Sequence, residues 1–304
     1  MAKYLLSICI STNNVARWVI PAVRNIYSLG SDEKKFEVVI ADNGDHSELE
    51  SSVNEFYNHS NFRYVKTKAE GFYNIIENFV QARGDFMINL NHRSLLQKGA
   101  IEQIYEVGCK YLEQRPLIYF SNGFLKKNQV LEYETFNQFL NILSYRSSLS
   151  QGLFFWKEDL LNIPNIKFAK MSPNVSLLFD SKIKNKFVID DRLISNEQDS
   201  RGKFGYDLFD TFAVHYLDLV NSVREEGHIS KKTFYKIKID VFKFLRRCYF
   251  DMTLLGHKGN YKLEGIKDSL SVYYSANYYF KMITYSYSIA IIKASYNKIF
   301  KFRK

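Results

Sequence analysis

The first 120 residues alternate short apolar runs with segments in which apolar residues recur every three to four positions. Short apolar runs are typical of buried strands, and the wider spacing is typical of helices with one buried face. The runs of strand length are Tyr4–Ile10, Phe36–Ala41, Phe62–Thr67 and Asp85–Leu90. The helical patterns are Val15–Gly30, Ser47–His59, Gly71–Gly84 and Gly99–Gln114. The pattern therefore predicts strands and helices in alternation.

This alternation predicts the fold class. It implies right-handed βαβ units, and hence an α/β fold with a mainly parallel sheet covered by helices. In such sheets, ligands bind where the carboxyl ends of the strands meet. The polar segments Ser11–Asn14, Asp42–Asp45 and Asn91–Ser94 each follow a predicted strand. We therefore expect these three segments to converge on one rim of the sheet.

The rest of the chain changes character at about residue 205. The strand-like runs before this point are Leu117–Phe124, Gly152–Trp156 and Lys186–Ser195. After it, apolar residues recur at helical spacing from Phe234 to Met252, and a second helical stretch runs from about Leu263 to Phe302. The predicted organisation is an α/β domain over 1–205, followed by a basic, aromatic-rich helical region over 206–304.

Three sequence motifs of the predicted rim occur in a recognisable order. Ser7–Asn14 reads SICISTNN, Val38–Asp45 reads VVIADNGD, and Glu70–Leu90 reads EGFYNIIENFVQARGDFMINL. In order and spacing, over about 100 residues, they resemble the family 2 glycosyltransferases of GT-A fold. That family usually follows its first strand with Pro-Thr-Tyr-Asn, of which Thr12 and Asn14 match. The resemblance implies a GT-A fold.

The resemblance also implies a nucleotide site at the rim, built from Ser11, Thr12, Asn14, Asp42, Gly71 and Asn74. Asp42 would accept hydrogen bonds from the base or ribose of a nucleotide-sugar donor, because a carboxylate offers lone pairs in a planar fork. Gly71 would allow close approach of the backbone, and Asn74 would contact the nucleotide or fix the loop. Asn14 has a structural alternative, as a cap of the helix that follows it.

The tip after the fourth strand departs from the family pattern. The family places an Asp-x-Asp signature there, whose carboxylates hold Mg²⁺ or Mn²⁺ against the diphosphate of the donor. Here the aligned residues are Asn91, His92 and Arg93, and none carries a carboxylate. The motif does not support Mg²⁺ or Mn²⁺, which would need a carboxylate from elsewhere on the rim, Asp42 or Asp45. No metal ligand and no cofactor is assigned.

Three interpretations of this tip stay open. In the first, Arg93 and His92 replace the ion at the diphosphate, because a guanidinium binds phosphate oxygens bidentately. In the second, the site binds a nucleotide or glycan but turns over poorly or not at all. In the third, His92 and Arg93 form a solvated turn. The first makes the chain an enzyme without a standard metal site.

No residue is assigned as the catalytic base, which inverting members of the family need near the acceptor. The pair Glu158–Asp159 suits the start of a helix, and the pair Asp190–Asp191 suits a turn. Phe154–Leu161 and Ser172–Ser195 resemble, more loosely, bacterial abequosyltransferase-like O-antigen and capsule glycosyltransferases. Asn174 stands where that subgroup has His. The catalytic residues are therefore left unassigned.

The positive charge of the chain is confined to its C-terminal quarter. Lys231–Lys304 holds 16 Lys and Arg against 4 Asp and Glu, a net charge of +12. The whole chain carries +10, so the remainder carries −2. Interleaved Tyr and Phe suit an anionic membrane surface, where each nearby Lys or Arg contributes about 1 kcal/mol. A helical cap or a homo-oligomer contact is the alternative, and no nucleic-acid-binding motif is present.

The cysteines and the apolar runs bear on the compartment. Cys9, Cys109 and Cys248 are odd in number and far apart, which argues against a disulfide framework or zinc site and fits a reducing cytosol. The longest uncharged runs of the tail, Ser269–Phe280 and Met282–Ile292, are shorter than the roughly 18–20 apolar residues of a spanning helix. We expect a cytoplasmic protein, peripheral at the inner face of the cell membrane.

These features predict a bacterial glycosyltransferase of surface-glycan assembly. It would transfer a sugar from a nucleotide-sugar donor to a cell-surface polysaccharide or a lipid-linked oligosaccharide. The alternative is a non-catalytic GT-A-like scaffold or partner subunit in a glycan-assembly complex. Measurable nucleotide affinity favours the enzyme. A nucleic-acid partner would require steeply salt-dependent binding to oligonucleotides, and none is predicted.

Overall fold

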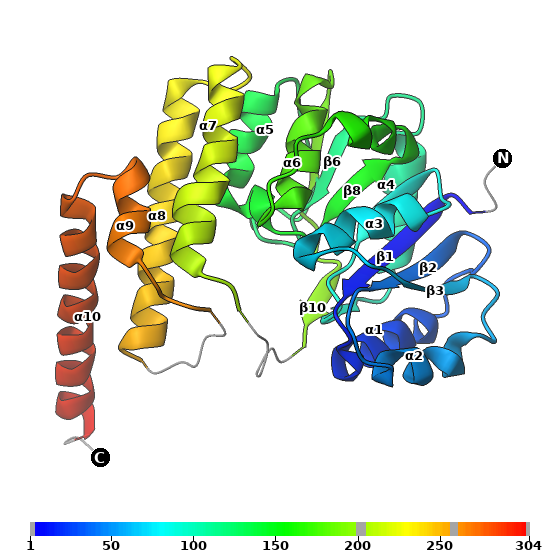
Figure 1. The fold of residues 1–304 in the computed structure, drawn as a ribbon, viewed down its shortest axis with the longest axis horizontal. Coiled ribbons are helices and arrows are strands. Elements are labelled where there is room, and N and C mark those ends of the chain that lie inside the picture. The colour runs from blue at the N-terminus through cyan, green and yellow to red at the C-terminus, as the bar shows by residue number, and fades with distance from the viewer. Residues whose placement is uncertain (1–3, 199–204, 256–260, 302–304) are drawn as a thin grey trace. The chain divides into compact units, whose positions relative to one another are not determined.

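The computed structural model describes residues 4–198, 205–255 and 261–301, with side chains of the last helix up to residue 289. The chain forms two compact units, Met1–Asp199 and Ser200–Lys304. The first is an α/β unit and the second is helical (Figure 1). The domain boundary expected after residue 205 adjoins residues 199–204, which lie outside the described residues.

The first unit is built on an eight-stranded sheet in the order β3-β2-β1-β4-β8-β6-β9-β7. These strands are β1 (Leu6–Thr12), β2 (Phe36–Asp42), β3 (Phe62–Lys66), β4 (Phe86–Asn89), β6 (Leu117–Phe120), β7 (Val130–Tyr133), β8 (Leu153–Trp156) and β9 (Phe187–Asp190). All strands except β7 and β8 point the same way. The mainly parallel sheet expected from the sequence is confirmed. A separate ribbon pairs β5 (Ser94–Leu96) with β10 (Ser195–Glu197), antiparallel.

Helices cover both faces of this sheet (Figure 1). The α-helices are α1 (Ala16–Ser28), α2 (Glu48–Ser52), α3 (Asn74–Gln81), α4 (Ala100–Lys110), α5 (Phe136–Leu143) and α6 (Pro173–Asp180). The short helical turns are η1 (Val53–Phe56), η2 (Gly71–Tyr73), η3 (Ser144–Ser148), η4 (Lys157–Asn165) and η5 (Ser181–Ile183). The acidic helix expected over Ser47–His59 is α2 followed by η1.

The alternation of side chains along the strands separates two packed layers. Ile8, Val38 and Ile88 are in register and belong to one apolar core with residues of α1, α2 and α4. The opposite face packs on α3 and α5, and Phe79 of α3 meets Phe155 of β8 with ring centroids 5.2 Å apart. Because both faces are buried, the central strands are largely apolar, as the sequence pattern indicated, while the edge strands β3 and β7 are only partly buried.

The second unit begins with a π-helical segment, η6 (Asp210–Tyr216), which continues as α7 (Leu217–Glu225). It then contains α8 (Lys231–Thr253), α9 (Ile266–Tyr273) and α10 (Asn277–Lys301). The Ser230 hydroxyl caps α8 by accepting a hydrogen bond from the Thr233 amide at 3.1 Å. Ile237, Val241 and Leu245 form the buried stripe of α8. Across the described residues, no helix is long and apolar enough to span a bilayer.

Candidate functional site

Strands β1, β2, β3 and β4 end at the same edge of the sheet, and the segments that follow them touch. The carboxylate of Asp42 accepts a hydrogen bond from the backbone amide of Asn14, which joins the ends of β2 and β1. Nδ1 of His92, in the loop after β4, lies 3.2 Å from the carbonyl oxygen of Ser11. The three polar segments singled out in the sequence therefore meet at one rim.

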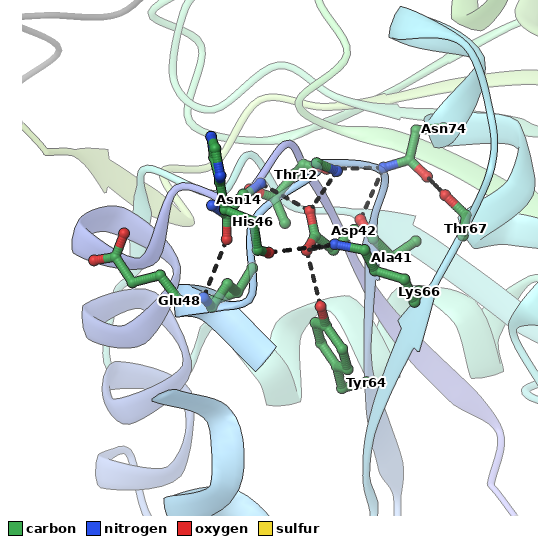
Figure 2. A network of polar contacts seen from close by, with 12 residues as sticks. Thr12, Asn14, Ala41, Asp42, His46, Glu48, Tyr64, Lys66, Thr67 and Asn74 are labelled. Atoms are coloured by element: carbon green, nitrogen blue, oxygen red, sulfur yellow. Dashed lines mark hydrogen bonds and ion pairs between the residues drawn. The ribbon is translucent and has the colours of Figure 1, made fainter. Parts of the chain in front are cut away.

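Asp42, the last residue of β2, lies at the centre of the network in Figure 2. Its side chain is fully buried. Oδ1 accepts hydrogen bonds from the backbone amides of Asn14 at 2.7 Å and Gly44 at 2.9 Å. Oδ2 accepts from the Tyr64 hydroxyl at 2.8 Å and from Nζ of Lys66 at 3.1 Å. A buried carboxylate needs such donors, and these four occupy the lone-pair positions that it offers.

The third strand supplies two of the four donors. β2 and β3 run parallel with Ile40 opposite Tyr64 and Asp42 opposite Lys66, so the two β3 side chains project on the same side of the sheet. Burial, followed by the hydrogen bond to Asp42, raises the pKa of the Tyr64 hydroxyl. Tyr64 therefore keeps its proton and donates it. Lys66 is the most exposed partner, with 39% of its side chain accessible to solvent.

Asn74, the first residue of α3, joins the ends of the strands (Figure 2). Its Nδ2 donates to the carbonyl oxygens of Thr12 at 3.0 Å and Ala41 at 2.8 Å. Its Oδ1 accepts a hydrogen bond from Thr67 at 2.6 Å. The side chain is buried, so these bonds satisfy groups that water does not reach. This geometry fits the loop-fixing role of the two expected for Asn74.

Asn14 caps a helix, but a different one from that expected. Its Oδ1 accepts a hydrogen bond from the Leu49 amide at 3.1 Å, in the first turn of α2. Helix α1 starts after Val15 without a side-chain cap. Asn14 has a positive φ of 48°, which Asn tolerates better than most residues. A Cβ added to Gly44 would lie 2.4 Å from Cβ of Asn14, so only glycine lets these two loops touch.

Ser11 and Thr12 lie inside β1 rather than in a loop. The Ser11 hydroxyl accepts a hydrogen bond from Nδ2 of Asn78 at 3.2 Å and lies 3.4 Å from the carbonyl oxygen of Asn74. The Thr12 hydroxyl is buried and has no hydrogen-bond partner among the described residues. A buried hydroxyl without a partner costs about 1–3 kcal/mol. Thr12 is therefore a buried, unpaired polar group within the described part of the rim.

The close approach of the backbone to a nucleotide expected at Gly71 stays a prediction. A Cβ added there would have no atom within 4 Å. Glycine is needed for another reason, since φ is +51°, in the left-handed region that side chains disfavour. The carbonyl oxygen of Gly71 accepts a hydrogen bond from Nδ2 of Asn43 at 3.0 Å. Gly71 thus sets the course of the loop before α3 and ties it to the turn after β2.

The tip at Asn91, His92 and Arg93 packs on Trp18 of α1. The His92 ring stacks on Trp18 with centroids 5.5 Å apart. Because the Ser11 carbonyl oxygen can only accept, the His92 nitrogen facing it, Nδ1, carries the hydrogen. The Arg93 guanidinium carbon lies 6.0 Å from the Trp18 ring centroid, and only 17% of the Arg93 side chain is exposed. The tip is therefore packed, which contradicts the solvated turn.

The donor set of the tip does not fit Mg²⁺ or Mn²⁺. These ions require several oxygen ligands, with carboxylates prominent among them. Asn91 Oδ1 already accepts a hydrogen bond from the Arg93 backbone amide at 3.1 Å. The carboxylate that contacts the tip is that of Glu197 on β10, which pairs with Arg93 at 3.7 Å and accepts a hydrogen bond from Ser94 at 2.7 Å. Within the described ranges, no three His, Cys, Asp or Glu side chains are grouped to hold a metal.

Asp190 and Asp191 have structural partners. Asp191 is fully buried and accepts hydrogen bonds from the Ser121 hydroxyl at 2.5 Å and the Lys127 amide at 2.6 Å. It therefore shapes the loop between β6 and β7. Asp190 is also buried and pairs with Arg192 at 2.6 Å. Both carboxylates are engaged within the protein fold.

Asp159 lies in the first turn of η4, as expected for the Glu158–Asp159 pair. Its Oδ2 accepts a hydrogen bond from the Trp156 amide at 3.0 Å, and Oδ1 pairs with Lys184 at 2.6 Å. Burial raises the pKa of Asp159 despite the neighbouring cation.

The first turn of α6 holds Asn174, whose Nδ2 donates to the Ser148 carbonyl oxygen at 3.0 Å. That turn, Pro173–Ser176, contains no carboxylate.

A surface cleft of about 490 Å³ lies at the opposite edge of the sheet, where β6 and β9 begin and β8 ends. Its lining residues are Gln114, Arg115, Pro116, Glu158, Asp159, Lys184, Asn185 and Lys186. The charged ones are paired, Arg115 with Glu158, Lys184 with Asp159, and Lys186 with Glu132. Because the charges balance and the polar rim is elsewhere, this cleft is not the candidate site.

Sequence reasoning missed four residues that shape the site, namely Trp18, Tyr64, Lys66 and Glu197. Lys66 ends a predicted strand, so the rule that placed Asp42 at the rim also places Lys66 beside it. Trp18 was visible as a large aromatic in the helix after the first strand. Glu197 reaches the tip through the β5–β10 ribbon, which no local pattern indicates.

Comparisons with known proteins concern the fold. No family model matches the chain, and no curated protein matches its sequence. A crystal structure of residues 1–349 of S. aureus TarS superposes with a TM-score of 0.57 at 14% identity, over 82% of this chain and 75% of that chain. TarS in complex with UDP-GlcNAc gives 0.56 at 15% identity, over 88% of this chain and 80% of that chain.

A second solved structure agrees over more of the chain. The mannosyltransferase PcManGT from Pyrobaculum calidifontis, in complex with GDP-Man and Mn²⁺, gives a TM-score of 0.58 at 14% identity. The superposition covers 96% of this chain and 87% of that chain. Both proteins share the mixed sheet, mostly parallel and covered by helices. The chain therefore has the GT-A fold.

Proposed function

We propose that the chain is a glycosyltransferase that moves a sugar from a nucleotide-sugar donor to a cell-surface polysaccharide or lipid-linked oligosaccharide. The network around Asp42 carries the proposal. It joins the carboxyl ends of β1, β2 and β3 to the start of α3, at the edge where α/β sheets bind ligands. TarS was solved with UDP and with UDP-GlcNAc, and PcManGT with GDP-Man, which supports this class of donor.

In the proposed complex, the nucleoside lies against Ser11, Thr12, Asn14 and the Asp42 network. Asn74 and Gly71 hold the loop before α3 in place beside it. The site is preorganised, because hydrogen bonds already hold its side chains in place before a ligand binds.

The diphosphate would lie at Asn91, His92 and Arg93. When the bond between the anomeric carbon and the diphosphate oxygen breaks, negative charge grows on the leaving diphosphate. A guanidinium stabilises such charge through two parallel hydrogen bonds, most strongly where water is scarce. Arg93 is largely buried, and its present anionic partner, Glu197, is 42% exposed. In this proposal the diphosphate takes the place of Glu197 on Arg93.

A non-catalytic nucleotide-binding subunit is the second candidate. One observation favours it, since the carboxylates considered for a base, Asp159, Asp190 and Asp191, are all paired within the fold. Without a base, activation of an acceptor hydroxyl loses the contribution that general base catalysis supplies, about 10²–10⁴-fold. Slow release of free sugar from UDP-GlcNAc or GDP-Man, followed by NMR, would favour the enzyme. Binding without any breakdown would favour the subunit.

The proposal is tested by calorimetric titration with UDP, CDP, GDP and TDP, each with Mn²⁺ and again with EDTA. Binding of one nucleotide that survives EDTA is the expected result, and it also names the donor class. Binding that requires Mn²⁺ would overturn the role given to Arg93 and His92. Absence of binding under both conditions would overturn the nucleotide site altogether.

The helical region 206–304 is proposed to rest on an anionic membrane surface, at the inner face of the cell membrane. The first turns of α8 expose Lys231, Lys232 and Lys236. The same unit exposes large aromatic side chains, with Tyr235 at 59% and Phe280 at 61%. Cations and exposed aromatics together suit the headgroup region of a bilayer, next to which a lipid-linked acceptor would lie.

This placement is tested by co-sedimentation with vesicles. Vesicles that contain phosphatidylglycerol should retain the protein at low salt and release it as salt rises, because exposed charges are screened. Vesicles of phosphatidylcholine alone should retain little. Equal retention by both would show that the charge of Lys231–Lys304 does not direct membrane binding.

A further inference from the structure

We propose that Lys66, rather than Asp42, contacts the base of the nucleotide. It would select bases that carry a carbonyl oxygen at position 4 of a pyrimidine or position 6 of a purine. The inference rests on the proposed function and assigns base recognition within the same site. It makes Asp42 a positioning residue that holds Lys66. Bases of this kind are uracil, thymine and guanine, whereas cytosine and adenine carry an amino group there.

The burial of Asp42 is the first step. Its side chain has no exposed surface, and each oxygen already accepts two hydrogen bonds. Two of the donors are backbone amides, which cannot leave without moving the loops after β1 and β2. A third is Tyr64, whose raised pKa keeps the donated proton in place. A base that came to Asp42 would have to break one of these bonds.

Lys66, and not Asp42, is the charged side chain of this network that is accessible to solvent. Its side chain is 39% exposed, while the carboxylate behind it is fully buried. An ammonium group has three hydrogens. Asp42 accepts one at 3.1 Å, and the carbonyl oxygen of His46, at 3.5 Å, is the only other acceptor near it within the described residues. At least one hydrogen is left for a ligand.

The position of this hydrogen is set by the fold. Lys66 ends β3 directly opposite Asp42, in the parallel register of β2 and β3. The shared oxygen, Oδ2, is also fixed by Tyr64 at 2.8 Å. A lysine chain that is free in solution loses rotamer entropy on binding, and an anchored one has already lost part of it. The anchored ammonium is therefore a preorganised donor.

The chemistry of the ammonium group decides which bases fit. It donates and cannot accept, so its partner must be an acceptor. O4 of uracil and thymine and O6 of guanine are acceptors, while N4 of cytosine and N6 of adenine carry hydrogens. An amino group placed against Lys66 leaves two donors facing each other. We expect the loss of one charge-assisted hydrogen bond, roughly tenfold or more in affinity.

The test is calorimetric titration of the full chain with two pairs of nucleotides, UDP with CDP and GDP with ADP. Within at least one pair, the unaltered protein should bind the carbonyl-bearing member at least about tenfold tighter. Lys66→Met should lower the affinity for that member to the level of the other. Lys66→Arg, which keeps a cationic donor, should preserve the preference. Lys68→Met removes the same charge at an exposed neighbouring position and should leave the affinity for both nucleotides unchanged.

Three results would overturn the proposal. One is an equal loss of affinity for both nucleotides of a pair in Lys66→Met, which would mean that Lys66 contacts a phosphate or has only a structural role. Another is binding by the unaltered protein without preference, or with preference for CDP or ADP, which is informative even where the Met variant does not fold. In both cases the nucleotide site itself stands. Failure of the unaltered protein to bind any of the four would overturn the proposed function as well.

Discussion

Trp18 and His92 stack face to face, with ring planes 13° from parallel and centroids 5.5 Å apart. Trp18 comes from α1 and His92 from the loop after β4, so the stack joins two segments distant in sequence. Arg93 lies against the same indole ring. A buried aromatic side chain thus supports the tip, at the position where the family that the sequence resembles carries metal-binding carboxylates. The support is steric and electrostatic, because the indole face attracts cations.

Trp18→Leu should therefore weaken binding of a nucleoside diphosphate more than binding of the matching nucleoside. The stack contributes about 0.5–1.5 kcal/mol beyond area burial, and its loss lets His92 and Arg93 move. We expect about a tenfold loss for the diphosphate, measured by calorimetry. Tyr57→Leu, which removes an exposed aromatic of the same unit, should leave both affinities unchanged. Equal losses for nucleoside and diphosphate would separate the tip from phosphate binding.

Asn74→Asp should destabilise the first unit although it changes few atoms. The new oxygen would face the carbonyl oxygens of Thr12 and Ala41, which now accept hydrogen bonds from Nδ2. Two buried acceptors would lose their donor, at about 1–3 kcal/mol each. We expect the free energy of unfolding to fall by about 2–5 kcal/mol in urea titrations. Asn58→Ala, at an exposed position, should change it by less than about 0.5 kcal/mol.

The parts of the fold that could be predicted are those with a local signature. Strands β1, β2 and β4 are nearly continuous apolar runs because both of their faces are buried. β7 was missed because it is only partly buried and carries the charged Glu132. The β5–β10 ribbon was missed because it joins Ser94 to Glu197, 103 positions apart, through strands of three residues each. Such short pairings depend on the tertiary fold.

The candidate site shows the same division. Asp42 was identified because a carboxylate ends a buried strand, and that position follows from topology. The saturation of Asp42 could not be predicted, since it requires the loop geometry at Gly44 and the register that sets Lys66 opposite. The structural alternative for Asn14 was a cap of α1, the nearest helix in sequence, whereas its side chain caps α2. Local proximity was misleading there.

Glu132 should make the first unit less stable in acid. Lys186, Tyr111 and Lys110 hydrogen-bond to this carboxylate and lower its pKa from 4.5 to about 2. The unfolded chain binds the proton first, so stability rises with pH from about 2 to about 4.5 and is fully present above that range. Because the side chain is 37% exposed, solvent screening limits the effect at neutral pH to about 1 kcal/mol.

Glu132→Gln should remove this dependence. Urea midpoints at neutral pH should fall slightly, and the difference from the unaltered protein should shrink as the pH falls toward 2, where Glu132 is protonated in the unfolded chain and becomes protonated in the folded one. Glu134→Gln, in the same segment, is the matched control and should leave the pH dependence of the urea midpoint in acid unchanged. A difference between Glu132→Gln and the unaltered protein that grows toward acid would contradict the proposed ion-pair origin.

Arg93→Ala should lower the affinity for a nucleoside diphosphate by about ten- to a hundredfold and the affinity for the nucleoside by much less. The reason is the loss of a charge-assisted bond of about 1.5–3 kcal/mol at a largely buried guanidinium. EDTA should have no effect on either the unaltered protein or the variant, because the tip lacks the oxygen ligands that Mg²⁺ and Mn²⁺ need. Calorimetry with and without EDTA measures both effects.

Glu197→Gln provides the opposite change at the same tip. It removes the carboxylate that now faces Arg93 at 3.7 Å but keeps an acceptor for the Ser94 hydroxyl. With its competing anion gone, Arg93 should bind the diphosphate several-fold tighter, and the gain should vanish in the double variant with Arg93→Ala. Weaker diphosphate binding in Glu197→Gln would mean that the carboxylate orients Arg93 for the ligand rather than competes with it. An equal gain in the double variant would show that Glu197 acts on the ligand directly, through charge repulsion and independently of Arg93.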